Sequence, residues 1–172
     1  MPKLDLRDPQ QFIPRELFAA YVGPGSDDLL AYYDKVQQRG NPVVMSFNLL
    51  AILILPAWFG LRRLWVLWGT YTGLIGLVTF AEQAFKIGIP SGAFVGIGVA
   101  MGLMARGFLL VNANGLYLKL KRQGLEPSAV REALEGRARS SIPLAVVGAL
   151  GGVGVILALA HLAELLFARA GG

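Results

Sequence analysis

Four long apolar runs divide the chain, and short polar or basic segments separate them. The runs are residues 43–60, 64–81, 89–111 and 142–167. About 20 apolar residues are enough to cross the hydrocarbon of a bilayer as a helix. The pattern therefore predicts an all-α integral membrane protein, with residues 1–42 as a helical N-terminal segment and residues 43–172 as the membrane domain.

The first run differs from the others because Ser46, Asn48 and Pro56 interrupt it. Its 18 residues would extend about 27 Å as a straight helix, which is marginal for a crossing. Broken backbone at membrane depth is tolerated where it is buried against protein. A re-entrant or interfacial helical element is the alternative to a crossing.

The distribution of Lys and Arg distinguishes these alternatives. If all four runs cross, seven of these residues lie on the cytoplasmic side and eight outside. If residues 43–60 return to the side they left, 13 lie inside and two outside, with Arg106 in the membrane. The positive-inside rule favours the second arrangement. It predicts three spans and a re-entrant element, with a cytoplasmic N-terminus and residues 112–141 as a basic cytoplasmic loop.

The N-terminal segment has the features of two short helices. Pro14 suits the start of a helix over residues 15–21, and Gly23-Pro24-Gly25 predicts a turn. Ser26 can then cap a second helix, along which one apolar stripe follows helical spacing: Leu29, Tyr33 and Val36. This stripe could dock on a membrane surface or a partner, or pack on the protein's own membrane domain. No early apolar core of a signal peptide is visible, so we expect the N-terminus to stay in the cytoplasm.

The composition agrees with a membrane protein. Of the 172 residues, 55% are hydrophobic and 16% are charged, whereas soluble domains carry about 25% charged residues. The chain has no cysteine and a single histidine, which excludes disulfides, thiol catalysis and a His-rich metal site. The net charge of +5 fits membrane orientation and anionic lipids better than nucleic acid.

Several polar residues lie inside or beside the apolar runs. We expect them to form a polar membrane cluster: Arg106, Asn48, Asn112, Asn114, Tyr117, Arg62 and Arg63. Amides between membrane helices hydrogen-bond across the contact. An arginine in a span is costly unless it is paired or reaches the headgroups. The alternative is a ligand or ion path, or an anion pocket built from the same arginines.

Three further features carry predictions. His161 and Glu164 share a helix face, and His161 is a weak candidate ligand of a haem or pigment, although the sequence predicts no cofactor and no metal. Lys119, Lys121 and Arg122 are candidate contacts for anionic headgroups.

An amphipathic helix over residues 127–135 carries an Arg131–Glu135 pair. Small-residue pairs such as Gly148/Gly152 permit close helix packing.

Three blocks of sequence have a recognisable form: Tyr21-Val22-Gly23-Pro24, Ser46-Phe47-Asn48-Leu49-Leu50-Ala51 with Pro56-Ala57-Trp58-Phe59-Gly60-Leu61-Arg62-Arg63, and Asn112-Ala113-Asn114-Gly115-Leu116-Tyr117. Together they resemble a bacterial membrane-protein family catalogued as domain of unknown function 2628. The resemblance covers roughly residues 21–122. It implies the same kind of protein and adds no activity.

No combination of serine, aspartate and histidine falls at a spacing that suggests catalysis. The sequence therefore predicts a non-enzymatic, multi-pass protein of the bacterial inner membrane. Its expected role is an accessory or scaffold subunit, with the lipid bilayer and other membrane proteins as partners. The alternative is a small transporter, channel or lipid-binding protein that uses Arg106 and the asparagines.

Overall fold

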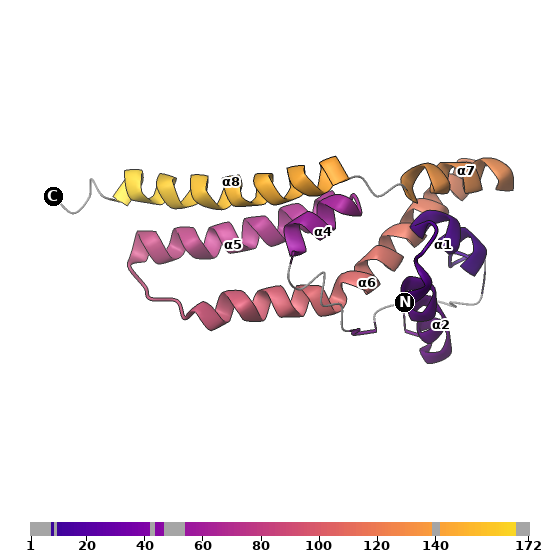
Figure 1. The fold of residues 1–172 in the computed structure, drawn as a ribbon, viewed down its shortest axis with the longest axis horizontal. Coiled ribbons are helices and arrows are strands. Elements are labelled where there is room, and N and C mark those ends of the chain that lie inside the picture. Colours follow the sequence, from indigo (N-terminus) through magenta and orange to yellow (C-terminus); the bar gives the residue numbers. More distant parts are fainter. Residues whose placement is uncertain (1–7, 9, 42–43, 47–53, 139–141, 168–172) are drawn as a thin grey trace. The chain divides into compact units, whose positions relative to one another are not determined.

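The computed structural model describes residues 8, 10–41, 44–46, 54–138 and 142–167. All regular elements in these ranges are α-helices (Figure 1). Contacts divide the chain into a first unit, residues 1–48 with 103–140, and a second unit, residues 49–102 with 141–172. The predicted domains place residues 103–140 with the membrane domain, whereas the contacts place them with the N-terminal helices.

The first unit contains α1 (Arg15–Val22), α2 (Asp27–Arg39), α7 (Pro127–Ala138) and the part of α6 (Ser91–Arg122) from residue 103 onward. Two glycines with positive φ, Gly23 and Gly25, make the predicted turn between α1 and α2. Ser26 is the N-cap residue of α2, as predicted, but its side chain makes no capping hydrogen bond. The hydroxyl of Ser26 donates back to the carbonyl oxygen of Val22 at 3.1 Å and so supports the end of α1.

The core of the first unit follows helical periodicity. The predicted stripe of α2, Leu29, Tyr33 and Val36, is buried. From α6 the buried residues recur every fourth position: Ala105, Leu109, Ala113 and Tyr117. Val130 and Leu134 are buried on α7, which packs against α1. Full burial of one Leu side chain contributes about 1.5–3 kcal/mol, so these stripes hold the unit together.

Helix α6 continues beyond the predicted end of its apolar run. The sequence predicts a span that ends at Val111 and a loop over residues 112–141, but the helix reaches Arg122. Hydropathy falls after Val111 because the exposed face becomes polar. The stripe that reaches Tyr117 remains apolar and buried, and it continues the helix inside the first unit.

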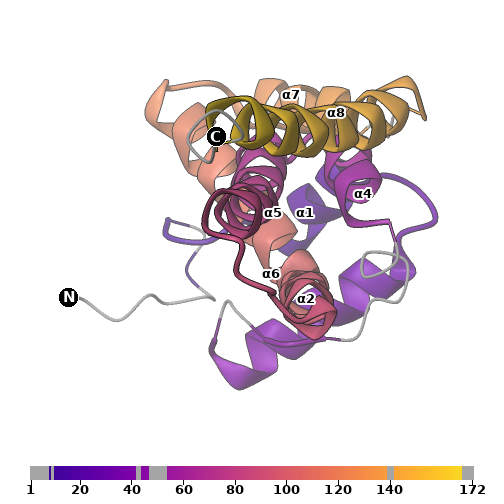
Figure 2. The same ribbon diagram turned by 90° about the vertical axis from the view of Figure 1, so that its left-hand side faces the viewer.

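The second unit contains α4 (Leu55–Leu61), α5 (Trp65–Phe85), α8 (Ile142–Phe167) and the part of α6 up to residue 102. The bounds of α8 agree with the predicted run, residues 142–167. Helices α4 and α5 both lie against α8, as Figure 2 shows from one end.

Helix α4 runs antiparallel to α8. Pro56 lies beside Gly152, and four residues later Gly60 lies beside Leu144 and Gly148. A helix of seven residues is about 10 Å long, so α4 covers only the first part of α8. Residues 47–53, which precede it, lie outside the described residues, and the re-entrant element therefore stays a prediction.

Among the residues that the structure describes, two helices are long and apolar enough to cross a membrane: Ser91–Arg122 and Ile142–Leu166. Helix α5 has 21 residues, but Tyr71, Glu82, Gln83 and its threonines lower its hydropathy. The third predicted span therefore stays a prediction. The surface of α8 is strongly apolar, with Leu150 69% and Ile142 76% exposed.

Candidate functional site

The residues of the predicted polar cluster lie in both units. Arg106, Asn112, Asn114 and Tyr117 belong to α6 in the first unit, and Arg62 and Arg63 belong to the second. Asn48 lies outside the described residues.

Arg106 forms an ion pair with Asp28, at the start of α2. Its Nη2 donates to the carboxylate at 2.8 Å, with 19% of the Arg106 side chain and 59% of the Asp28 side chain exposed. A structural pair was one of the alternatives for this arginine. Because the carboxylate is mostly exposed, the pair contributes at most about 1 kcal/mol.

Tyr32 lies near this pair and holds the chain that leaves α2. Its hydroxyl donates to the carbonyl oxygen of Val44 at 2.8 Å and accepts from the Val44 N–H at 3.1 Å. Two residues later, the N–H of Ser46 donates to the carbonyl oxygen of Leu103 on α6. Burial raises the pKa of Tyr32, and the positive charge of Arg106 partly opposes the shift.

Asn112 and Asn114 bind the two ends of α1. Asn112 Nδ2 donates to the Tyr21 hydroxyl at 2.9 Å. Asn114 Oδ1 accepts the N–H of Ile13 at 2.8 Å, and its Nδ2 donates to the carbonyl oxygen of Gln11 at 3.5 Å. These partners come from the N-terminal segment, which the predicted cluster did not include.

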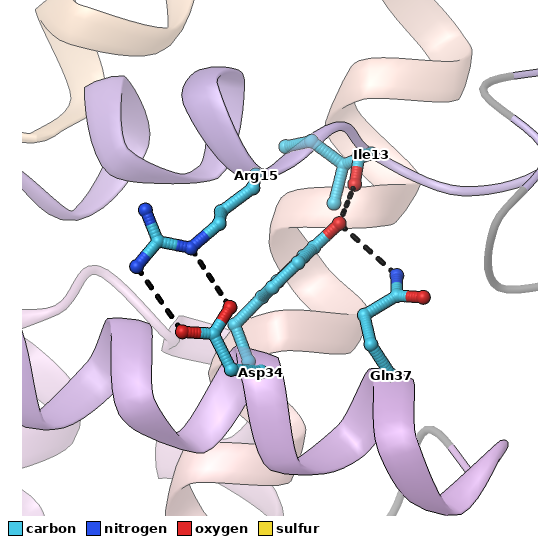
Figure 3. A network of polar contacts seen from close by, with 5 residues as sticks. Ile13, Arg15, Asp34 and Gln37 are labelled. Atoms are coloured by element: carbon cyan, nitrogen blue, oxygen red, sulfur yellow. Dashed lines mark hydrogen bonds and ion pairs between the residues drawn. The ribbon is translucent and has the colours of Figure 1, made fainter.

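The backbone of Ile13 is held from two sides. Ile13 is fully buried, so its polar groups need partners inside the protein. Its N–H uses Asn114, and its carbonyl oxygen accepts the Tyr33 hydroxyl at 2.7 Å. Gln37 Nε2 donates to the same hydroxyl at 3.1 Å (Figure 3). Side chains of α2 and α6 thus fix the residue that enters α1.

Arg15 and Asp34 join α1 to α2 beside this bond (Figure 3). The guanidinium donates twice, at 2.8 and 3.1 Å. The hydrogen bond and the charge of Asp34 raise the pKa of Arg15. Sequence reasoning missed this pair, because nothing in the local spacing indicates that residues 19 apart meet. The spacing of Tyr33 and Gln37 at i and i+4 was a usable signal.

The basic residues at the end of α6 are mostly solvent-facing. Lys119 and Arg122 are exposed, and Lys121 Nζ lies 5.8 Å from the centre of the Tyr117 ring. Positive charges in the last turn are favourable for the helix dipole. Lys119 lies eight residues beyond Val111, the last residue of the apolar run, which is about 12 Å along the helix axis. These basic residues therefore lie beyond the apolar part of α6.

In the second unit, Arg62 and Arg63 form the turn between α4 and α5. Arg63 has a left-handed φ of 55°, which is uncommon outside glycine. Trp65 and Trp68 follow, with ring centres 6.1 Å apart, and Trp68 Nε1 donates to the carbonyl oxygen of Gly148 at 2.7 Å. The indole thus joins α5 to α8.

His161 and Glu164 lie on one face of α8, as predicted. His161 Nδ1 is 3.6 Å from the Glu164 carboxylate, and both side chains are exposed. Among the described residues, no group of three or more His, Cys, Asp and Glu residues could hold a metal ion. The weak assignment of a haem or pigment ligand to His161 stays a prediction.

Within the described structure, the polar residues of α6 therefore fix the N-terminal segment, because Arg106, Asn112 and Asn114 each bind a residue of it. None of these contacts places a nucleophile beside a general base. The resemblance to domain of unknown function 2628 stays a prediction. Comparison with protein-family profiles, with curated proteins and with solved structures finds no match to this chain.

Proposed function

We propose that the chain is a multi-pass membrane protein whose second unit lies in the bilayer and whose first unit lies in water. The apolar surface of α8 carries this proposal. Only 11% of the most apolar 18-residue stretch of α8 is buried inside the protein, whereas a core helix of a soluble protein is mostly buried. Soluble monomers rarely expose contiguous apolar patches larger than a few hundred Å², and a bilayer would cover this one.

The first unit contrasts with this surface. Its apolar stripes are buried, and charged pairs such as Arg15–Asp34 and Arg131–Glu135 lie on its exterior. A closed core with exposed ion pairs is typical of a unit surrounded by water. The two units therefore favour two different solvents.

Three crossings are proposed, by α5, by the apolar part of α6 and by α8. Helix α4 is too short to cross at about 10 Å, and we propose that it belongs to an element that returns to its side of entry. This arrangement puts 14 of the 16 Lys and Arg residues on the side of the first unit, with Arg106 included through its pair with Asp28. By the positive-inside rule that side is the cytoplasm of a bacterial inner membrane.

The proposed role is that of a non-enzymatic accessory or scaffold subunit of a larger membrane assembly. It is supported by the use of the conspicuous polar residues: Arg106, Asn112 and Asn114 hold the chain's own N-terminal helices. The first unit then offers its outer faces to a partner in the cytoplasm. Crosslinking in native membranes tests this role, and recovery of the monomer alone would contradict it.

Cysteine labelling tests the topology, because the chain has no cysteine. Single cysteines at Arg62, Gly88 and Gln123 would be treated with a membrane-impermeant thiol reagent in intact cells. We expect labelling of Gly88→Cys only, with Arg62→Cys and Gln123→Cys labelled after permeabilisation. Labelling of Arg62→Cys from outside would exclude the three-span arrangement.

The second candidate is a transporter, channel or lipid-binding protein that uses Arg106 and Asn48, Asn112 and Asn114. One observation favours it: Nε of Arg106 is buried and has no hydrogen-bond partner in the described part of the chain. Solute flux in proteoliposomes, measured for the native chain and for Arg106→Gln, distinguishes this candidate. The scaffold proposal expects no flux in either.

A further inference from the structure

The turn between α4 and α5 lies at the end of the second unit where α8 begins. Gly60 lies directly against Leu144, so Arg62 and Arg63 are close to the level of the first turn of α8. Strongly exposed apolar residues follow on both helices, with Val66 83% and Ile142 76% exposed. Under the proposed function, this level is the boundary between headgroups and hydrocarbon.

One nitrogen of the Arg63 guanidinium lacks an acceptor at this boundary. Its Nε is buried and has no hydrogen-bond partner among the described residues. The acidic residues of the second unit are Glu82 and Glu164. Glu82 lies 17 residues beyond Trp65 on α5, which is about 25 Å along the axis. Arg63 therefore has no counter-charge within its own unit.

Trp65 adds an exposed aromatic side chain beside the two arginines. Its side chain is exposed, and its ring packs edge-on against Trp68. An amphipathic indole beside arginines is typical of the interfacial layer of a bilayer. Arginine also binds phosphate oxygens with two parallel hydrogen bonds, which lysine cannot do.

We infer that Arg63, with Arg62 beside it, binds the phosphate of an anionic phospholipid, while Trp65 lies against the start of its acyl chains. This inference rests on the proposed function and names the lipid partner of the second unit. This site is distinct from Lys119, Lys121 and Arg122, the predicted contacts for anionic headgroups. Those residues begin about 12 Å beyond Val111, the end of the apolar run, along α6, and attraction to a charged surface falls off within about 8 Å in physiological salt.

Native mass spectrometry of the full chain in a neutral detergent tests the inference. The protein would be titrated with dioleoylphosphatidylglycerol and, separately, with dioleoylphosphatidylcholine. We expect tighter binding of the phosphatidylglycerol, and an affinity about tenfold weaker in Arg62→Gln/Arg63→Gln. The matched control, Lys119→Gln/Arg122→Gln, removes the same charge and should leave the affinity unchanged.

A second variant separates lipid binding from folding. Arg63→Gly removes the guanidinium and also suits the left-handed backbone at this position, so this variant should fold. Its affinity for phosphatidylglycerol should nevertheless be lower than that of the native chain. Unchanged affinity in both Arg63 variants would overturn the inference, and so would an equal loss in the control. Displacement of the lipid by millimolar inorganic phosphate would show a free-phosphate site and also overturn it.

Alkaline carbonate extraction of the native chain from membranes distinguishes a failure of the proposed membrane function from a failure of the lipid site alone. Release of the protein by carbonate would contradict the proposed function itself. Retention in the membrane together with unchanged lipid affinity in the variants would overturn only the lipid site.

Discussion

Gly60 and Gly148 meet so closely where α4 crosses α8 that neither position has space for a side chain. A Cβ atom on either glycine would lie 3.1 Å from the α-carbon of the other. A Cβ on Gly148 would also lie 2.6 Å from the carbonyl oxygen of Pro56. Small residues that allow backbones to approach in this way are characteristic of packing between membrane helices.

The substitution Gly148→Ala should therefore destabilise the second unit. The methyl group meets backbone atoms that cannot rotate away, and overpacking of this kind costs about 1–3 kcal/mol. Thermal unfolding in detergent, followed by circular dichroism, measures the effect. Gly154→Ala is the control on the same helix, because its Cβ would meet nothing within 4 Å. Equal melting temperatures for the two variants would contradict this packing.

Asn114→Ala should loosen the start of α1 more than Asn112→Ala does. Loss of Asn114 leaves the buried N–H of Ile13 without its acceptor, which costs about 1–3 kcal/mol. Loss of Asn112 removes one bond to the Tyr21 hydroxyl, worth about 0.5–1.5 kcal/mol. Amide hydrogen exchange at Ile13 and limited proteolysis of the N-terminal segment compare the variants. The reverse order would show that Asn114 does not hold this backbone.

The Arg106–Asp28 pair should contribute little to stability. A double-mutant cycle with Arg106→Gln and Asp28→Asn should give a coupling energy below about 1 kcal/mol that decreases with added salt, because the carboxylate is mostly exposed. The exposed pair Arg131–Glu135 provides the comparison, with about 0.3–0.5 kcal/mol expected for i,i+4 pairs. A salt-independent coupling of several kcal/mol would indicate that a bilayer or partner covers Asp28.

The first unit should lose stability at alkaline pH. Burial raises the pKa of Tyr32 and of Tyr33 above the ordinary value of 10.0. Above pH 10 the unfolded chain therefore releases phenolic protons that the folded chain retains, and the free energy of unfolding falls. Below pH 10 these groups leave stability independent of pH.

Phenolate absorbance and circular dichroism, followed together from pH 8 to pH 12, measure this dependence. Helix content should fall as the buried phenols of Tyr32 and Tyr33 ionise. The fall of helix content with pH should be less steep in Tyr33→Phe, which has one buried phenol fewer. Ionisation of all tyrosines near pH 10 with the helices intact would contradict the burial of these two rings.

The sequence predicts the helices where the apolar period and the turn residues agree. The run of residues 142–167 became α8, the stripe of Leu29, Tyr33 and Val36 is buried, and the Arg131–Glu135 pair of α7 is confirmed at 2.8 Å. All of these features are local, because they depend on neighbours one or two turns apart.

The errors come from long-range contacts. The loop predicted after Val111 is helical because Ala113 and Tyr117 are buried in a core that includes the N-terminal helices. The partners of Arg106, Asn112 and Asn114 are 78 to 103 residues away in sequence. A single sequence gives no signal for such pairs, and it therefore predicts contacts of the polar residues with one another instead.

The first unit is assembled from two stretches of chain that the second unit separates. On the ribosome, α1 and α2 emerge first, while the residues that cover them on α6 and α7 follow only after the apolar helix α5. At about 5–20 residues per second, residues 49–138 take roughly 5 to 20 seconds to synthesise. During that interval Phe18, Leu29 and Val36 have no complete core to enter. A truncated chain that ends before α7 leaves uncovered the face of α1 that packs on α7, and such exposed apolar surface is a target for chaperones and proteases.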